Sequence, residues 1–282
     1  MKNVTVIGSG TMGRGIAFSC ARAGFTTIVQ DINDTALDNC QSYIVHQFNR
    51  SVEKGELSRE EANQAINRLT YTTSIEEAAK DADLVIEAVL EIMDLKIEIF
   101  KQLDKLVKPS ALLATNTSTM SPTEIAAQTS RPDRCIALHF FNPVPKMKLI
   151  EVICGLETSE ETINLCFEFG RKLGKECVRI NEFPGFAVSR MNCLIGNEAM
   201  IMVMEGVGTV EDIDKAIKLG LNHPMGPLEL ADLVGLDTRL RNMEYLFQTL
   251  GEKYRPCPIL VKYVKAGRLG KKSGKGFYNY SK

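Results

Sequence analysis

The chain has 282 residues, of which 44% are hydrophobic and 24% charged, a composition typical of a folded protein with one large domain or two smaller ones. Its 34 basic and 35 acidic residues give a net charge of −1. Such a chain lacks the basic field with which proteins hold a phosphate backbone, so we expect no nucleic-acid partner.

The sequence also argues against a membrane or secreted protein. The most apolar stretch, 193–207, is interrupted by Asn197, Glu198 and Glu205, so no window reaches the roughly 18 apolar residues of a membrane span. The N-terminus enters a strand-like run at residue 4 without a signal-like segment. The eight Cys are scattered without metal-ligand spacing and are interpreted as small buried hydrophobic residues. We expect a cytoplasmic protein with no membrane partner and no bound metal.

Residues 1–184 alternate β-branched runs with helical stretches. This alternation predicts a Rossmann-type, doubly wound and mostly parallel sheet that is covered on both faces. The apolar residues of 35–69 recur at helical spacing and predict a helical hairpin that projects from the sheet, with its turn at Lys54-Gly55. The expected strands are 3–8, 26–30, 84–89, 112–115 and 135–139.

The pattern changes after residue 139. The turn at 142–145 leads at once into the short strand 149–153, so these two neighbouring strands can pair only antiparallel. A helix at 160–173 and a strand at 177–180 complete a first domain of residues 1–184. We expect residues 185–282 to form an all-α C-terminal domain. Its expected helices are 186–204, 210–219, 227–250 and 258–266.

A glycine motif follows the first strand and opens a helix. Its residues are Gly8, Ser9, Gly10, Thr11, Met12 and Gly13. In this context G-x-G-x-x-G predicts a dinucleotide site, because Gly8 permits the tight turn and Gly10 lets the backbone approach a pyrophosphate at the helix N-terminus. Gly13 lets helix and strand pack closely. The alternative is a glycine-rich turn that holds no ligand.

The second strand bears on the choice of cofactor. Asp31 stands at its end, where a carboxylate would accept hydrogen bonds from the adenosine ribose hydroxyls. Residues 32–35 offer no Arg or Lys for a 2′-phosphate, so NAD is favoured over NADP. A second glycine cluster, 270–276, lacks the spacing of a P-loop and follows no strand, which excludes nucleotide hydrolysis there.

Only three His are available as a general base. His46 lies in the helical hairpin and His223 at a turn between helices, whereas His139 stands at the carboxyl end of a strand, where α/β sheets bind ligands. A hairpin centred on Pro145 places Glu151 opposite His139, and this carboxylate could hold one ring nitrogen. The alternative interpretation is a solvated Glu on an edge strand.

Polar residues also end the strand at 112–115. Asn116, Thr117 and Ser118 would reach the same edge of the sheet and suit hydrogen bonds to a substrate oxygen and the nicotinamide. Ser and Thr at such a place are also common caps, here for a helix at 122–127.

Together these residues make a resemblance that covers nearly the whole chain. The sequence resembles the 3-hydroxyacyl-CoA dehydrogenase family, and within it the bacterial 3-hydroxybutyryl-CoA dehydrogenases of fatty acid and butyrate metabolism. The motifs that carry the resemblance are 8–13, 116–118, 139–143, 148–152, 184–186, 223–227 and 274–278.

The resemblance implies an NAD-dependent enzyme that oxidises a 3-hydroxyacyl-CoA, in the first place 3-hydroxybutyryl-CoA, to the 3-oxoacyl-CoA and runs the reverse reaction. It implies that His139 is the general base or acid, that Glu151 orients it, and that Ser118 contacts the 3-oxygen of the substrate. The NAD contacts would fall on Gly8, Gly10, Thr11, Met12, Gly13, Asp31, Glu91, Lys96, Asn116, Ser118, Asn142 and Lys272.

Substrate contacts are implied at Ser118, Asn142 and Ser189, and at Lys54, which the resemblance places against coenzyme A. Ser189 departs from the family pattern, in which Asn is common at this position. Its side chain is shorter, and Asn192, one helical turn on, presents a similar face and is a candidate substitute. Residues 1–184 are thus interpreted as the NAD-binding domain and residues 185–282 as a domain for substrate binding and dimerisation, because the apolar helices predict a homodimer.

Two other functions remain open. One is a dehydrogenase of free β-hydroxy acids, which would use a Lys base on the helix after the domain boundary, whereas 186–204 contains no Lys. The other is a non-catalytic NAD-binding protein. The intact pair of His139 and Glu151 argues against the second.

Overall fold

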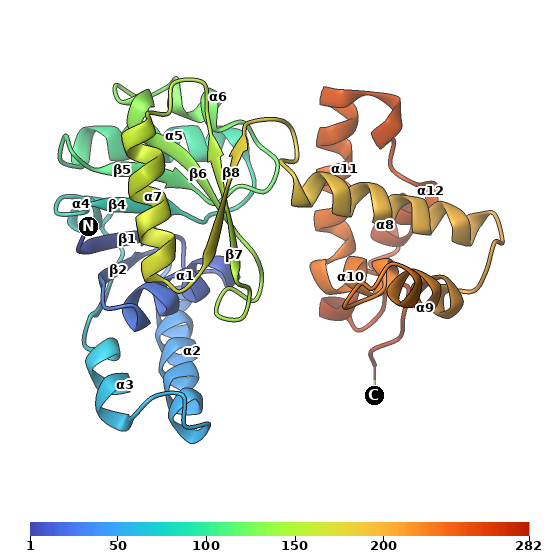
Figure 1. Ribbon diagram of the computed structural model, residues 1–282, viewed down its shortest axis with the longest axis horizontal. Coiled ribbons are helices and arrows are strands. Elements are labelled where there is room, and N and C mark those ends of the chain that lie inside the picture. The colour runs from blue at the N-terminus through green and yellow to red at the C-terminus, as the bar shows by residue number, and fades with distance from the viewer. Residues whose placement is uncertain (282) are drawn as a thin grey trace. The chain divides into compact units, whose positions relative to one another are not determined.

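The computed structural model describes residues 1–281, and the chain divides into two compact units, Met1–Glu182 and Phe183–Lys282. Figure 1 shows the helices and strands of each unit. The division falls between Glu182 and Phe183, whereas the sequence places a domain boundary after residue 184. The roles assigned to the two domains stay predictions. No helix within residues 1–281 has the length and apolar character needed to cross a membrane.

The first unit is built on one eight-stranded sheet with the order β3-β2-β1-β4-β5-β6-β7-β8. The first six strands run parallel; β7 is antiparallel to β6 and parallel to β8. The predicted Rossmann-type sheet and its antiparallel β6–β7 pair are confirmed. The strands are β1 (Asn3–Ile7), β2 (Thr26–Gln30), β3 (Leu69–Thr72), β4 (Leu84–Glu87), β5 (Leu112–Thr115), β6 (Cys135–Phe140), β7 (Leu149–Cys154) and β8 (Glu176–Asn181).

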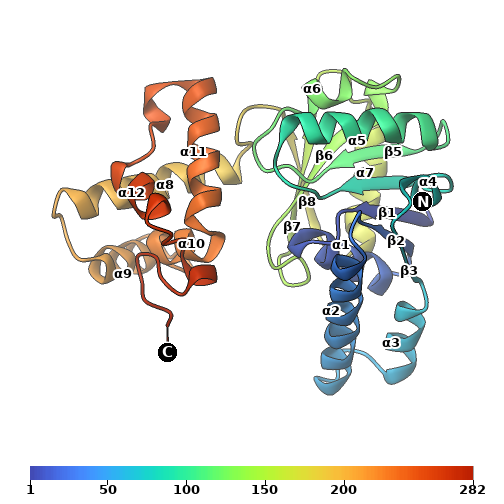
Figure 2. The ribbon, with the colours of Figure 1, turned by 180° about the vertical axis from the view of Figure 1, so that it is seen from behind.

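Helices cover both faces of this sheet. Helix α7 lies in front of it in Figure 1, and α5 lies in front in Figure 2, which shows the molecule from behind. The helices of the first unit are α1 (Thr11–Arg22), α2 (Asp34–Glu53), α3 (Arg59–Ile66), α4 (Ile75–Ala79), α5 (Met93–Leu106), α6 (Pro122–Ala126) and α7 (Glu160–Lys172).

The predicted helical hairpin is the pair α2–α3, which extends away from the sheet in both views. Its turn lies at Lys54 and Gly55, as predicted, and Gly55 has a φ of +70° that suits glycine. A capping box between Ser58 and Glu61 starts α3. The prediction that the hairpin continues to Leu69 is wrong, because Leu69 begins the edge strand β3.

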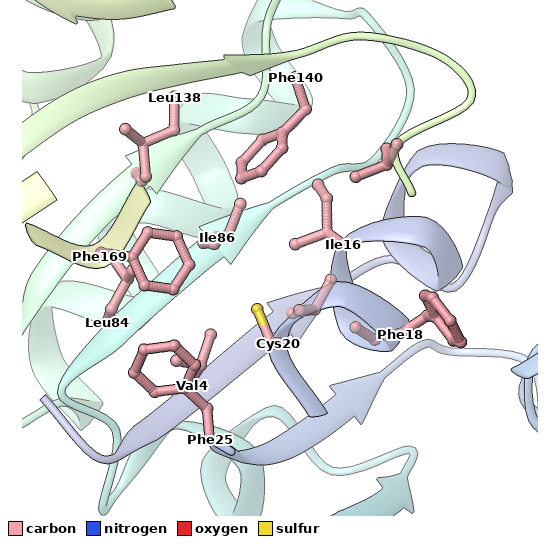
Figure 3. Packing of buried hydrophobic residues seen from close by; sticks show 14 of the residues in the cluster. Val4, Ile16, Phe18, Cys20, Phe25, Leu84, Ile86, Leu138, Phe140 and Phe169 are labelled. Atoms are coloured by element: carbon pink, nitrogen blue, oxygen red, sulfur yellow. The ribbon is translucent and has the colours of Figure 1, made fainter. Parts of the chain in front are cut away.

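Alternate residues of the central strands point to opposite faces and build two separate cores. Val6 and Ile86 belong to the cluster under α1, α2, α3 and α7, whereas their neighbours Ile7 and Val85 belong to the cluster under α4, α5 and α6. Figure 3 shows part of the first cluster, to which α1 contributes Ile16 and Cys20. Strands buried on both faces explain why β4 and β5 are apolar at nearly every position.

The cysteines are part of these cores. Cys177 is half-buried and the other seven are buried, and burial raises the pKa of every one of the eight thiols. The pKa of Cys40 rises to about 12 and that of Cys135 to about 11. These thiols are therefore protonated at neutral pH and poor nucleophiles.

The second unit is all-α, as predicted, and packs around a third core cluster. The single helix expected at 227–250 is wrong, because Gly235, with a φ of +100°, separates two helices. The helices of this unit are α8 (Val188–Met204), α9 (Val210–Gly220), α10 (Pro227–Val234), α11 (Leu236–Leu250) and α12 (Pro258–Lys265).

The second glycine cluster has a packing role in this unit. The carboxylate of Asp232 on α10 accepts hydrogen bonds from the backbone N–H groups of Phe277 (3.0 Å) and Tyr278 (2.9 Å). A Cβ on Gly276 would lie 2.0 Å from Asp232 Oδ1, so only glycine lets the C-terminal segment approach this carboxylate.

Candidate active site

The fold brings the candidate residues of the first unit to one edge of the sheet. Strands β2, β1, β4, β5 and β6 are neighbours in that order and run parallel, so their carboxyl ends meet at the same edge. Between β1 and β4 the strand order reverses, which is the position where open α/β sheets bind ligands. The segments at this edge carry Asp31, Gly8–Gly13, Glu91, Asn116–Ser118 and His139–Asn142.

The glycine turn after β1 combines close packing with open space. Gly8 has a φ of +95°, and a Cβ on Gly13 would lie 1.8 Å from the carbonyl oxygen of Gly8. Gly10 differs, because its backbone is ordinary (φ −63°, ψ −168°) and a Cβ there would have no heavy atom within 4 Å. The fold itself therefore requires Gly8 and Gly13, whereas Gly10 leaves room beside the N-terminus of α1.

This N-terminus is suited to an anion. The N-cap residue of α1 is Gly10, which has no side chain to cap the helix, so the N–H groups of the first turn are suited to a bound anion. Beside it, Asp31 Oδ2 accepts hydrogen bonds from the N–H (2.8 Å) and the hydroxyl (2.7 Å) of Ser9, which fixes the carboxylate against the glycine turn. The open space at Gly10, the uncapped helix and the fixed carboxylate fit the pyrophosphate and ribose of a dinucleotide.

His139 and Glu151 form a buried pair on adjacent strands. They are direct partners in the β6–β7 register, as predicted, and His139 Nδ1 lies 2.7 Å from Glu151 Oε2. The side chains are 5% and 0% exposed. Asn116 Oδ1 accepts a hydrogen bond of 2.9 Å from the N–H of Phe140, which ties the end of β6 to the segment after β5. Glu151 therefore holds the imidazole ring, and Asn116 holds the backbone next to His139.

The segment after β5 is held by a carboxylate from the segment after β4. Glu91 Oε1 accepts hydrogen bonds from the N–H of Ser118 (2.8 Å) and from the hydroxyl of Thr117. The alternative that these residues cap the next helix is wrong, because the N-cap of α6 is Ser121, which accepts from the N–H of Glu124 at 3.0 Å. Ser118 is only half-buried.

Comparison with known proteins agrees with this geometry. Residues 3–183 match the family model described as 3-hydroxyacyl-CoA dehydrogenase, NAD binding domain, and residues 185–280 match 3-hydroxyacyl-CoA dehydrogenase, C-terminal domain. The chain therefore belongs to the 3-hydroxyacyl-CoA dehydrogenase family. It is an oxidoreductase acting on a CH–OH group, and its first unit is an NAD-binding domain.

Relatives in this family match along the whole chain. A protein of Bacillus subtilis named as a probable 3-hydroxybutyryl-CoA dehydrogenase is 51% identical over 281 residues, covering 99% of this chain and 98% of its own. A 3-hydroxybutyryl-CoA dehydrogenase of Bradyrhizobium diazoefficiens is 46% identical, with 99% and 96% covered. The crystal structure of (S)-3-hydroxybutyryl-CoA dehydrogenase from Ralstonia eutropha is 43% identical with a TM-score of 0.95, and all of both chains is covered.

The remaining site residues that the family resemblance implies lie in different surroundings. Lys54 is exposed at the tip of the α2–α3 hairpin and Asn142 is exposed after β6. Lys96 is fully buried, with Nζ 2.7 Å from Glu87 Oε1 and 3.3 Å from Glu91 Oε2. The contacts of these residues with NAD or substrate stay predictions.

Three other predicted residues lie in the second unit. Ser189 is half-buried in α8, Asn192 Oδ1 accepts from Arg239 Nη2 at 3.1 Å, and Lys272 Nζ bonds Asp237 Oδ1 at 2.6 Å. Their ligand contacts stay predictions as well. Glu87 was missed from the sequence, although an acidic residue at the end of a strand buried at every position was a usable signal.

Proposed function

We propose that this enzyme interconverts 3-hydroxybutyryl-CoA and acetoacetyl-CoA with NAD(H). The observation that carries the proposal is the buried pair of His139 and Glu151 at the same sheet edge as the dinucleotide-binding turn. The names of relatives that match along the whole chain support this substrate.

In this proposal His139 is the general base. The N–H at Nδ1 of His139 donates a hydrogen bond to Glu151, so Nε2 is the nitrogen that takes the proton of the substrate hydroxyl. The buried carboxylate stabilises the imidazolium that results, and it fixes the ring throughout. In the direction of reduction, His139 returns this proton to the 3-oxygen.

The dinucleotide site would hold the cofactor for the hydride transfer that accompanies this proton transfer. NAD held there would supply the acceptor for the hydride that leaves C3 of the substrate. The backbone N–H groups of Thr11, Met12 and Gly13 in the first turn of α1 would hold the pyrophosphate, and Asp31 would bind the ribose hydroxyls. Because residues 32–35 contain no Arg or Lys, we assign NAD rather than NADP.

The substrate would be oriented at the same edge. Ser118 donates its hydroxyl proton toward the 3-oxygen, while Asn116, Asn142 and Glu91 lie on the neighbouring segments that would surround the nicotinamide end. Lys54, exposed on the α2–α3 hairpin, is assigned to coenzyme A. Ser189 on α8 is assigned to the acyl portion of the substrate.

The second unit is assigned to substrate binding and to a homodimer. Its surface exposes apolar side chains that a monomer would leave in water. On helices α8, α9 and α10 and in the turns that follow them, the exposed apolar residues are Met191, Met204, Val207, Leu219, Leu221, Leu233 and Val234.

The proposal is tested with the purified protein by following the near-ultraviolet absorbance of NADH. We expect NADH to be oxidised when acetoacetyl-CoA is added, much more slowly with free acetoacetate, and more slowly when NADPH replaces NADH. A longer 3-oxoacyl-CoA measures chain-length preference. Equal rates with acetoacetate would make the enzyme a dehydrogenase of free β-hydroxy acids, and no oxidation with any 3-oxoacyl-CoA would overturn the proposal.

A further inference from the structure

We infer that Glu87 is a positioning residue for the reaction, acting through Lys96 and Glu91 on the backbone of Ser118. The inference rests on the proposed function, because it takes Ser118 as a substrate contact. Glu87 itself is 0% exposed and would touch neither substrate nor cofactor.

Glu87 joins three segments at the end of β4. Its Oε1 accepts hydrogen bonds from Lys96 Nζ (2.7 Å) and from the N–H of Val89 (2.8 Å). Its Oε2 accepts from the hydroxyl of Thr115 (2.7 Å) at the end of β5. One carboxylate thus links the end of β4, the first turns of α5 and the strand that leads to Ser118.

Lys96 connects Glu87 to Glu91, which lies closer to the sheet edge. Its side chain is fully buried, and its ammonium lies between two carboxylates, 2.7 Å from Glu87 Oε1 and 3.3 Å from Glu91 Oε2. A buried ammonium is costly without charged partners, so both carboxylates hold its position. The location of Glu91 therefore depends on the location of Lys96, and through it on Glu87.

Glu91 completes the chain of contacts. While its Oε2 faces Lys96, its Oε1 accepts from the N–H of Ser118 at 2.8 Å and from the hydroxyl of Thr117. The Glu91 side chain is 25% exposed, so burial decreases from Glu87 to the sheet edge. The segment that carries Ser118 is thus fixed by a continuous series of charged contacts that begins inside the core.

Glu87→Gln separates the charge from the hydrogen bonds. An amide oxygen in place of Oε1 still accepts from Lys96 and Val89, and the amide nitrogen can donate to the Thr115 hydroxyl, which rotates to accept. The variant loses only the negative charge, so Lys96 keeps Glu91 as its one charged partner and shifts toward it. A displacement of Ser118 by about 1 Å is enough to slow turnover up to about 100-fold, because the reaction rate depends steeply on the alignment of the reacting groups.

The kinetic test compares Glu87→Gln with a matched control on the same helix. Asp104, near the other end of α5, forms an ion pair of 2.7 Å with Arg131, and both side chains are 13% exposed. We expect Glu87→Gln to lower kcat for acetoacetyl-CoA reduction about 10- to 100-fold. Asp104→Asn, compared at a similar loss of thermal stability, should leave kcat within about twofold. Equal losses in the two variants would overturn the inference.

A double-mutant cycle shows whether Glu87 acts through Ser118. We expect Glu87→Gln in the Ser118→Ala background to lower kcat by less than about twofold, because the group being positioned is already absent. A full multiplication of the two single losses would contradict the inference. If Glu87→Gln does not fold, Glu87→Asp keeps the charge but shortens the side chain by one methylene group, so it should also lower kcat, and an unchanged kcat would contradict the inference.

A second readout does not depend on activity. Amide hydrogen exchange at Ser118 should accelerate about tenfold or more in Glu87→Gln and stay unchanged in Asp104→Asn, because only the first variant loosens Glu91 from the Ser118 N–H. Unchanged exchange in Glu87→Gln would overturn the inference. If the unmodified enzyme does not reduce acetoacetyl-CoA, the proposed function fails, whereas this measurement still decides whether Glu87 orders the segment.

Discussion

His139 and Glu151 face each other across the antiparallel strands β6 and β7, with 2.7 Å between Nδ1 and Oε2. The turn that joins the strands is itself held, because the ammonium of Lys175 donates to the carbonyl oxygens of Val144 and Met147, each at 2.7 Å. The pairing of His139 with Glu151 is therefore fixed by a single hairpin whose turn is held in place by Lys175.

Glu151→Gln should lower kcat about 10- to 100-fold with little change in NADH affinity. The amide oxygen can still accept from Nδ1, but it carries no charge to stabilise the imidazolium. Steady-state kinetics with acetoacetyl-CoA measure the loss. Glu160→Gln is the control, because Glu160 pairs with Arg179 on the surface of the same unit. Equal kcat values in the two variants would contradict the role of Glu151.

Two glycine substitutions should separate folding from cofactor binding. Gly13→Ala places a Cβ 1.8 Å from the Gly8 carbonyl oxygen and should lower the free energy of unfolding by about 2 kcal/mol or more. Gly10→Ala meets no protein atom within 4 Å and should change the free energy of unfolding by less than about 0.5 kcal/mol.

Gly10→Ala should instead weaken NADH binding, because its methyl group enters the space assigned to the pyrophosphate. We expect the Kd for NADH to rise about tenfold or more, a loss of roughly 1.4 kcal/mol. Urea unfolding and a fluorescence titration with NADH measure the two quantities. NADH binding as tight as in the unmodified enzyme would place the pyrophosphate elsewhere.

Asp83 should make stability depend on pH in the acid range. Burial by itself raises the pKa of Asp83, but the Lys108 ammonium and the N–H groups of Asn3 and Lys2 outweigh it and hold the pKa at about 2. Because the folded-state pKa is below the unfolded one, this stabilisation is complete above about pH 4 and is lost as the pH falls toward 2.

Asp83→Asn should therefore lower the free energy of unfolding by about 1 kcal/mol at neutral pH, a figure reduced for solvent screening of a partly exposed pair. Urea unfolding of both proteins at pH 7 and at successively lower pH values measures the difference. The gap should close toward pH 2, and a gap of constant size would show that the Asp83 charge is not its cause.

Features that depend on neighbouring residues were predictable from the sequence. The short turn after His139 fixes the β6–β7 register, and the glycine spacing fixes the turn before α1. Strand β3 was missed because it is short and half-exposed at the sheet edge, directly after a helical pattern. The break between α10 and α11 was missed because a lone Gly235 inside an apolar periodic run gives little indication of a positive φ.

The site residues near the ends of strands were predictable from the sequence. The residues that meet through contacts within the buried core were not. His139, Asp31 and Ser118 each follow or end a strand, so sheet topology alone brings them to one edge. Glu87 meets Lys96 only because α5 folds back over β4, and no spacing rule in the sequence shows that the two side chains are buried together.

The most direct test of the account is the turnover of His139→Gln with acetoacetyl-CoA and NADH. We expect kcat to fall about 10³-fold while the Kd for NADH stays within about twofold, because the proposed mechanism assigns the imidazole to transfer of the substrate proton and not to cofactor binding. His46→Gln, which changes an exposed His of α2, should retain full turnover. A His139→Gln enzyme that reduces acetoacetyl-CoA at close to the unmodified rate would contradict the central claim.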